Sequence, residues 1–563
     1  MKYLEQLLDY FAKNATRAYL VVTNLILVIF AIWFSNVGLL PFKNLGDFVF
    51  FAALALVLGL YRPSWTFAFF IGTLALENIN LAPESLGFSL RPYQFFGSIT
   101  VISLLVQFFS KRLAFSLPKF RWVDAMVLVF VVGGFLSALF ATNKGMSLKQ
   151  AIVAVSFVVL YFLTRTYVQS FQDVKRIFPF FLSGGLVVLL YSIWQNLRFL
   201  IGAESFEVMP GRPNSTFTEA DWLGMYLVFC LAVVLTILYK VRNKKQETMT
   251  KQIPNFKFQI SKNDLYFVSC ILYLVLTFIV LILTVSRSAW VGAVFVIIVF
   301  LKFILLENYA ELGEGDRSRW KKMVNILKIQ KWQWKKAGTQ LLFVLIAFGV
   351  ALLIAMPLTR FQIANRAVST GGLQKITIAC SGNQNIIPSP QKINNTEELE
   401  KYSCRHINLE DIENEKKLGN VIMEVYRPDP NVNIRAEIYQ KSWQQIKSNP
   451  VLGIGWGNIS EILGTDERGA GLNASNIFLE VWLGSGIFGI LSFVVLLGYI
   501  ILSAVVAFFE NDKKNKNSTA ILFLMAGWVA VVVPNLFNSG IFLGFIWVYF
   551  GIAVSLLAEK TND

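Results

Sequence analysis

Charged residues, histidine and cysteine are all scarce in this sequence. Only 15% of its 563 residues are Asp, Glu, Lys or Arg, whereas soluble globular proteins carry roughly 25%. One histidine, His406, and four cysteines without a CxxC pair give no spacing typical of a metal site. The low charge argues against a soluble globular domain. Because the His and Cys residues show no metal-binding spacing, we expect no metal, and we expect no cofactor.

Apolar residues are abundant instead. They make up 55% of the chain, with 50 Phe and 14 Trp, and the mean hydropathy is +0.56. A helix needs roughly 20 apolar residues to cross a bilayer, and aromatic belts mark both interfaces. Runs near this length lie at 18–37, 46–61, 64–78, 94–110, 122–141, 150–166, 177–200, 220–239, 265–284, 288–307, 340–357, 476–508, 518–536 and 539–557.

Three of these runs have unusual features. The first follows a charged stretch and has no small-residue cleavage site, so we interpret it as a retained signal anchor. The second and third are short enough to be tilted or re-entrant. The run 476–508 is long and carries Gly484, Gly486 and Gly489 near its start, which is compatible with a separate half-helix.

The net charge of +16 is gathered in the segments between apolar runs. No continuous basic face is visible, so we expect no nucleic-acid partner. Cytoplasmic loops are enriched in Lys and Arg, and fourteen crossings with both termini inside place every strongly basic loop there. The basic residues that assign this side are Lys111, Arg112, Lys119, Arg121, Arg242, Lys244, Lys245, Lys251, Lys257, Lys262, Arg317, Arg319, Lys321, Lys322, Lys328, Lys331, Lys335, Lys336, Lys513, Lys514 and Lys516.

The segment 358–473 then lies outside the cytoplasm, and it is neutral, with 13 basic and 13 acidic residues. It has a Pro/Asn-rich part and an acidic part at 397–417 that looks helical. Cys380 and Cys404 lie in it and could form a disulfide in an oxidising compartment. The predicted fold is all-α: a polytopic transmembrane bundle of about 14 spans in the inner membrane, with one large extracytoplasmic loop.

Polar residues that the membrane does not explain fall into four segments. The first, 211–227, holds Arg212 and then Ser215, Thr216, Glu219 and Asp221 before a span. A capping pattern at the start of a helix accounts for the residues from Thr216 to Asp221. It does not account for Arg212.

The second segment, 283–290, joins two spans with almost no loop and holds Arg287 at the outer boundary. A snorkelling anchor is one interpretation of this residue. The other is that Arg212 and Arg287 form a cationic pair at the membrane surface. The planar guanidinium fork suits phosphate oxygens, and the pyrophosphate of a lipid lies at that depth.

The third segment, 433–458, predicts an amphipathic helix that carries Arg435 and ends at Asn449-Pro450. The glycines of the following turn either let the backbone approach closely or leave N–H groups facing an anion. In the fourth segment, 472–491, Ser475 and Asn476 precede a span and Glu480 lies within it. A buried carboxylate in a span needs a partner, and we expect an arginine.

These four segments, in this order, resemble the O-antigen ligase/polymerase superfamily of bacterial envelope glycosyltransferases. The Arg-plus-STF segment, the Ser-Arg-Ser turn, the Arg…NPxxGxGxGN element and the Asn-x-x-Leu-Glu helix start carry the likeness, which is strongest over about 205–500. It implies a glycan donor linked to undecaprenyl pyrophosphate and transfer to an acceptor hydroxyl outside the cytoplasm. The implied domains are transmembrane helices at 1–204, a core at 205–510 that includes the loop, and C-terminal helices at 511–563.

By this resemblance Arg212 and Arg287 hold the pyrophosphate, and Arg435 matches a loop arginine of less certain role. Ser475 and Asn476 match the substrate-binding start of the last core helix. Ligases of the family usually place a His where this chain has Ser475, and Ser cannot serve as a general base near neutral pH. Either Glu480, Glu219 or Asp221 takes that role, or the chain is a polymerase-like relative, or it is inactive.

The predicted function is therefore that of a membrane glycosyltransferase, with a glycan, a lipid or a protein as acceptor. The alternative is a transporter or flippase for a polysaccharide or lipid-linked glycan, for which about fourteen spans are ordinary. Internal repeats and charges at the bilayer midplane would favour the transporter. The sequence has no evident repeat, and its unusual charges lie at the outer boundary.

Overall fold

The computed structural model describes residues 15–113, 115–209, 211–249, 262–311, 332–361, 373–381, 391–394, 396–407, 412–428, 430–465, 471–509 and 518–559. Much of the basic segments 242–262 and 313–336, all of 510–517 and the first fourteen residues lie outside these ranges. The predicted orientation is therefore not tested there. Pro388, Pro390 and Asn395 of the predicted Pro/Asn-rich part also lie outside the described residues.

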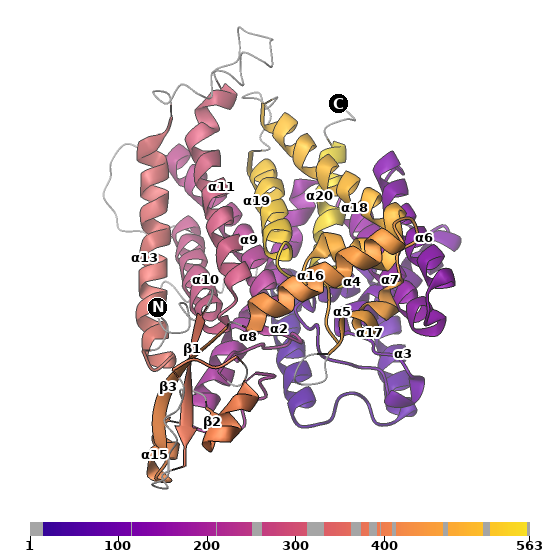
Figure 1. The fold of residues 1–563 in the computed structure, drawn as a ribbon. Helices are drawn as coiled ribbons and strands as arrows, with labels where there is room; N and C mark the ends of the chain where they lie inside the picture. The colour runs from indigo at the N-terminus through magenta and orange to yellow at the C-terminus, as the bar shows by residue number, and fades with distance from the viewer. Residues whose placement is uncertain are drawn as a thin grey trace. The chain divides into compact units, whose positions relative to one another are not determined.

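Helices dominate the structure, as the composition predicts (Figure 1). Each of the fourteen apolar runs contains one, and among the described residues eleven are long and apolar enough to cross a membrane. The helices are α2 Ala15–Asn36, α3 Leu45–Tyr61, α4 Pro63–Gly72, α5 Pro92–Phe109, α6 Trp122–Phe140, α7 Lys144–Tyr167, α8 Phe171–Leu200, α9 Ala220–Met249, α10 Lys262–Thr284, α11 Arg287–Glu311, α13 Trp334–Leu358, α18 Ile477–Phe509, α19 Ser518–Asn535 and α20 Gly544–Glu559. The chain is thus a multi-pass membrane protein with an all-α bundle.

Helix α4 shows why the third run looked too short. Its 10 residues extend about 15 Å, half the thickness of the hydrocarbon core. The chain then turns inside the protein, where Leu76 and Ala82 are fully buried. Gly72 at the end of α4 lies so close to Gly184 of α8 that a Cβ on Gly184 would overlap its carbonyl group. The third run is therefore a short helix that is continued by buried, non-helical chain.

Helix α18 is interrupted near its start, as its length and glycines suggest. Gly486 has φ +62° and ψ −161°, which are not helical angles. The backbone amide of the next residue, Ile487, donates to Val451 O at 2.9 Å instead of bonding within the helix. A half-helix of about nine residues therefore precedes the main span.

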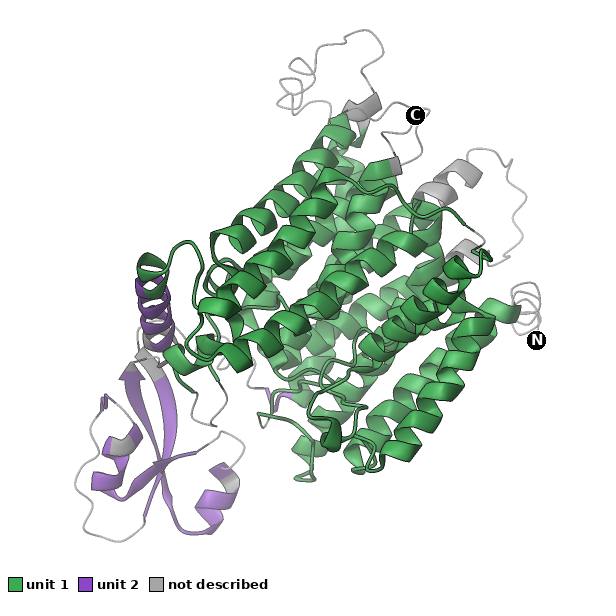
Figure 2. Cartoon of the chain, turned by 90° about the vertical axis from the view of Figure 1, so that its right-hand side faces the viewer, with its two compact units in different colours: residues 1–358, 445–563 green, residues 359–444 purple. Residues whose placement is uncertain are grey.

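Residues 359–444 form a separate compact unit (Figure 2). Its sheet has the antiparallel order β2-β1-β3, built from β1 Leu373–Cys380, β2 Cys404–His406 and β3 Val421–Pro428. Cys380 and Cys404 are register partners and form a disulfide, which confirms that prediction. A small core closes one side of the sheet; its buried members are Ile376, Ile378, Cys380, Ile393, Leu399, Cys404 and Val425.

The acidic part of this unit is helical only in pieces. A 3₁₀ segment, η3 Thr396–Tyr402, and a short helix, α15 Ile412–Lys417, flank β2. We did not predict this sheet from the sequence. Its strands have at most eight residues, and apolar and polar residues alternate over only a few positions in each. The longer helix α16, Pro430–Ser448, follows β3 and then η5 Trp456–Asn458 and α17 Ile459–Leu463 lead to α18.

Candidate functional site

Arg212 is tied to the end of a neighbouring helix. Its Nε donates to the carbonyl oxygen of Thr284 at 3.0 Å, and its Nη2 lies 3.4 Å from Asp221 Oδ2. Thr284 is the last residue of α10, whose final carbonyls have no partner within the helix and carry partial negative charge. Asp221 lies in the first turn of α9. Arg212 therefore joins the ends of two spans, and its side chain remains 26% exposed.

The capping interpretation is wrong for Thr216, and its neighbour Ser215 also bonds a distant part of the chain. The Thr216 hydroxyl donates to Ala75 O at 2.5 Å, and the amide of Asn78 donates to Thr216 O at 2.8 Å. The Ser215 hydroxyl donates to Val188 O at 3.2 Å. Both side chains therefore fasten this segment to the residues after α4 and to α8, and α9 begins only at Ala220.

The turn between α10 and α11 consists of Val285 and Ser286. Trp290 Nε1 donates back to Leu281 O at 2.7 Å and holds the turn closed. The hydroxyls of Ser286 and Ser288 lie 3.3 Å apart, and Asn538 Nδ2 donates to Ser288 Oγ at 2.7 Å. Arg287 is the first residue of α11 and is half-buried.

At the start of α18, Asn476 caps the half-helix, as the sequence pattern indicates. Its Oδ1 accepts from the amides of Phe478 and Leu479 at 2.9 and 3.3 Å, and its Nδ2 donates to Leu536 O at 3.0 Å. Glu480 is buried, and its Oε2 accepts from the amide of Ala474 at 2.6 Å. The expected arginine partner was wrong: within the described residues Glu480 bonds a backbone amide.

Three of the four polar segments therefore meet at one end of the bundle. Arg212 binds Thr284 at the end of α10, Asn538 binds Ser288 in the first turn of α11, and Asn476 binds Leu536 two residues before Asn538. We call these residues, with Asp221 and Thr284, the motif cluster. Glycine makes the close approach possible, because a Cβ on Gly224 of α9 would overlap Ala289 of α11.

Each of these segments contains a residue in the left-handed region of backbone space. The φ angles are +51° at Ser215, +53° at Val285 and +49° at Ser475. Such angles are uncommon outside glycine and are a genuine outlier for a β-branched residue such as Val285. Strain of this kind gathers at functional sites when the surroundings enforce it.

Glu219 and Arg435 are candidate site residues that do not belong to the motif cluster. Glu219 is half-buried and precedes α9. Arg435 is exposed on α16 and belongs to the unit 359–444. That Arg212 and Arg287 line one cavity stays a prediction.

The sequence reasoning missed two residues. Gln195 accepts a hydrogen bond from the Ser215 amide at 2.7 Å, and Asn538 donates to Ser288. Each could have been noticed as a side-chain amide inside or beside an apolar run.

The glycine turn after α16 serves close packing. The amides of Ile454 and Gly455 donate to Leu483 O at 2.8 and 3.2 Å. A Cβ on Gly453 would lie 2.5 Å from the same oxygen. These N–H groups are therefore used within the protein, which confirms close backbone approach over anion binding as the reason for the glycines.

Comparison with known proteins gives one family match, which begins after the first polar segment. Residues 272–494 match the family model Wzy_C, described as O-antigen ligase. The matched range starts inside α10, contains the Ser-Arg-Ser turn and the glycine turn, and ends in α18. No curated protein and no solved structure matches the chain.

Proposed function

Because residues 272–494 place this chain in the O-antigen ligase/polymerase superfamily, we propose that it moves an oligosaccharide or polysaccharide from undecaprenyl pyrophosphate to an acceptor hydroxyl. The reaction takes place on the extracytoplasmic face of the inner membrane. The acceptor is a glycan, a lipid or a protein. In the transfer, the bond between the anomeric carbon and the pyrophosphate oxygen breaks, and a bond from that carbon to the acceptor oxygen forms.

The observation that carries the proposal is the bond from Arg212 to the Thr284 carbonyl. It holds a partly exposed guanidinium against Thr284, three residues before Arg287 at the start of α11. Negative charge grows on the pyrophosphate as it leaves, and fixed cations at that point lower the barrier most. Arg212 and Arg287 supply this stabilisation.

A carboxylate takes the proton of the acceptor hydroxyl, a contribution of about 10²–10⁴ in rate. The candidates stand in different surroundings. Asp221 faces Arg212 and is 28% exposed, whereas Glu480 is buried and bonded to the Ala474 amide. An acceptor that arrives from the aqueous side can contact Asp221 and the half-buried Glu219 directly. It can contact Glu480 only by entering the protein interior. Ser475 and Asn476 border the donor at the start of α18.

The buried ion pairs favour this enzyme over a transporter. Asp124 pairs with Arg165, but the aspartate lies in the first turn of α6 and the arginine in the last turn of α7. Glu77 and Arg91, 2.9 Å apart, lie in the connection between α4 and α5, outside the long spans. Transport sites instead place their charges near the middle of the bilayer.

Replacing Arg212 or Arg287 by lysine tests the proposal. Lysine keeps the charge but loses the planar fork, and each lost charge-assisted bond costs about 1.5–3 kcal/mol. We expect glycan transfer to fall roughly ten- to a hundredfold. The measurement is the ratio of transferred to lipid-linked glycan in cells whose own copy is replaced by the variant.

Arg198→Lys is the matched control. Arg198 also ends a span, its Nε donates to the Glu204 carbonyl at 2.8 Å, and it stacks on Trp194 outside the motif cluster. Its lysine variant should transfer glycan normally. The pyrophosphate role is wrong if both Arg212→Lys and Arg287→Lys transfer at the control rate while the protein is present at equal amounts.

A further inference from the structure

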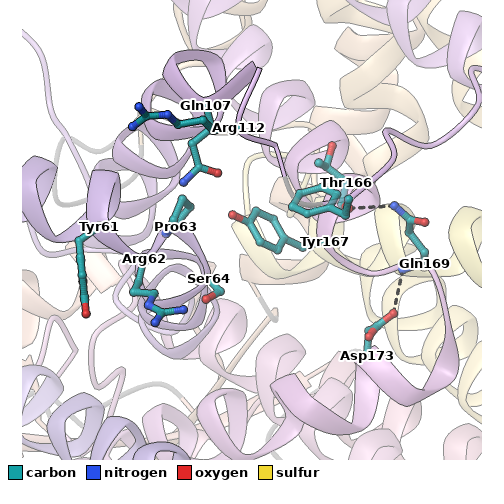
Figure 3. Close-up of a pocket in the computed structure, with 11 residues that line it drawn as sticks. Tyr61, Arg62, Pro63, Ser64, Gln107, Arg112, Thr166, Tyr167, Gln169 and Asp173 are labelled. Carbon is teal, nitrogen blue, oxygen red and sulfur yellow. Dashed lines mark hydrogen bonds between the residues drawn. The ribbon is translucent and has the colours of Figure 1, made fainter. Parts of the chain in front are cut away.

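A cavity of about 480 Å³ lies at the opposite end of the bundle from the motif cluster. Three connections meet around it: the junction of α3 and α4, the end of α5, and the turn from α7 to α8 (Figure 3). The charged and polar side chains that line it are Arg62, Ser64, Gln107, Arg112, Thr166, Tyr167, Gln169 and Asp173. The loop after α5 carries Lys111, Arg112, Lys119 and Arg121, which assigns this end to the cytoplasm.

Two arginines at the cavity have no acidic partner in the described part of the chain. Arg62 separates α3 from α4, and its guanidinium lies 5.4 Å from the ring of Tyr61. Arg112 follows α5, and only its backbone amide is hydrogen-bonded, to Gln107 O at 2.8 Å. Both side chains are exposed. They therefore offer two guanidinium forks to an anion that enters the cavity.

The single acid that lines the cavity is already engaged. Asp173 Oδ2 accepts from the hydroxyl and the amide of Ser170 at 2.8 and 3.1 Å, which caps α8. Its Oδ1 lies 2.9 Å from Arg176 Nη1. The negative charge of Asp173 is thus balanced outside the cavity, and the cavity keeps an excess of positive charge.

Neutral donors complete the lining. Tyr167 is fixed between aromatic rings, since its ring stacks on Phe67 at 4.2 Å and lies 5.5 Å from Phe115. Figure 3 shows its hydroxyl pointing toward the side of the cavity formed by Gln107 and Pro63. Hydroxyls and amides of this kind add hydrogen bonds to phosphate oxygens that arginine already attracts.

The helices beside the cavity present apolar side chains outward. Val57 of α3 is 65% exposed and Phe109 of α5 is 78% exposed, as expected of surfaces in contact with acyl chains. A ligand with both a phosphate and acyl chains can use the arginines and these two faces together. A free anion can use only the arginines.

We propose that this cavity binds the phosphodiester of an anionic glycerophospholipid from the cytoplasmic leaflet. Arg62 and Arg112 clamp the phosphate, Ser64, Gln107 and Tyr167 donate to it, and the acyl chains lie along α3 and α5. The cytoplasmic leaflet carries the anionic lipids that such basic pockets attract. The site lies apart from the motif cluster, so lipid binding can be measured without measuring glycan transfer.

Lipid binding to the full-length protein, measured by native mass spectrometry in detergent, tests this site. The probes are phosphatidylglycerol and phosphatidylcholine with the same acyl chains. We expect phosphatidylglycerol to bind at least about tenfold more tightly. Both lipids have the phosphodiester, but the choline of phosphatidylcholine cancels its negative charge and is repelled by the arginines. The double variant Arg62→Gln with Arg112→Gln should lose this preference. Arg121→Gln should keep it, because Arg121 belongs to the same loop but lies outside the cavity lining, where its Nη2 donates to Ala558 O at 3.0 Å.

Equal binding of the two lipids to the native protein would overturn the proposal. So would an unchanged preference in the double variant, or its loss in Arg121→Gln to the same degree. Inorganic phosphate at millimolar concentration is the third arm. If phosphate binds the native protein while phosphatidylglycerol shows no preference over phosphatidylcholine, the cavity is a site for a free anion and not for a lipid. Ser64→Ala, which removes one neutral donor without changing charge, should weaken phosphatidylglycerol binding by a smaller factor than the double variant.

Discussion

The bundle and the unit 359–444 reach a defined structure by different means. In the bundle, glycines let backbones touch: Gly453 meets Leu483, and Gly486 meets Val451. In the smaller unit, seven buried residues and one disulfide close a three-stranded sheet. The difference follows from the available core. A bundle with many apolar helices can specify its packing by shape, whereas a unit of this size gains more from a covalent link.

The largest effect on stability is expected where a substitution disturbs a close backbone contact in the bundle. A Cβ at Gly486 would overlap the carbonyl of Val451, and the residue has φ +62°. We expect Gly486→Ala to destabilise the bundle by roughly 3–5 kcal/mol, from backbone strain and overpacking together. Thermal unfolding of the purified protein measures it. Gly498→Ala, on the same helix with open space around it, should leave the unfolding temperature unchanged; equal effects of the two variants would refute specification by close contact.

Removing the disulfide should have the next largest effect, confined to the smaller unit. Cys380 and Cys404 enclose a 24-residue separation, and the link is worth about 3 kcal/mol. We expect the variant with both cysteines changed to serine to be cleaved faster by protease between 359 and 444. The bundle should unfold at the same temperature as before. Unaltered cleavage would show that the seven-residue core suffices without the link.

A moderate effect is expected at the motif cluster. Asn538→Ala removes the 2.7 Å bond to Ser288 Oγ, at a cost of about 1 kcal/mol. Glycan transfer should fall further than this loss of stability explains, because Ser288, the residue after Arg287, loses its bond to Asn538. Asn36→Ala, which removes the 3.0 Å bond from the Tyr191 hydroxyl, is the control. If both variants lower transfer equally, Asn538 contributes only stability.

The smallest effect is expected from a surface pair of the sheet. Lys375 Nζ lies 2.5 Å from Glu424 Oε2, and both side chains are exposed. The hydrogen bond to Glu424 raises the pKa of Lys375, so any stabilisation is present at neutral pH and is lost only as the pH rises through that raised pKa. We expect Lys375→Ala to leave protease resistance of the unit unchanged. A marked loss would mean that the sheet depends on charge as well as on its core.

The sequence alone determined the helices and their order. Apolar runs near the length of a bilayer form helices because unpaired backbone groups are too costly in lipid, and this holds whatever the neighbours are. Polar segments in a fixed order were enough to suggest the superfamily whose model matches residues 272–494. Asn476 was also predictable as a cap, because a cap bonds the amides that follow it directly.

Tertiary structure decided how the polar side chains are used. Thr216 bonds Ala75, Arg212 bonds Thr284, and the Arg62 and Arg112 cavity forms where three connections meet. A hydroxyl or guanidinium can satisfy many partners, so its residue type and spacing do not say which carbonyl it will reach. Helix packing selects that partner, since it brings residues from distant parts of the chain within hydrogen-bonding distance.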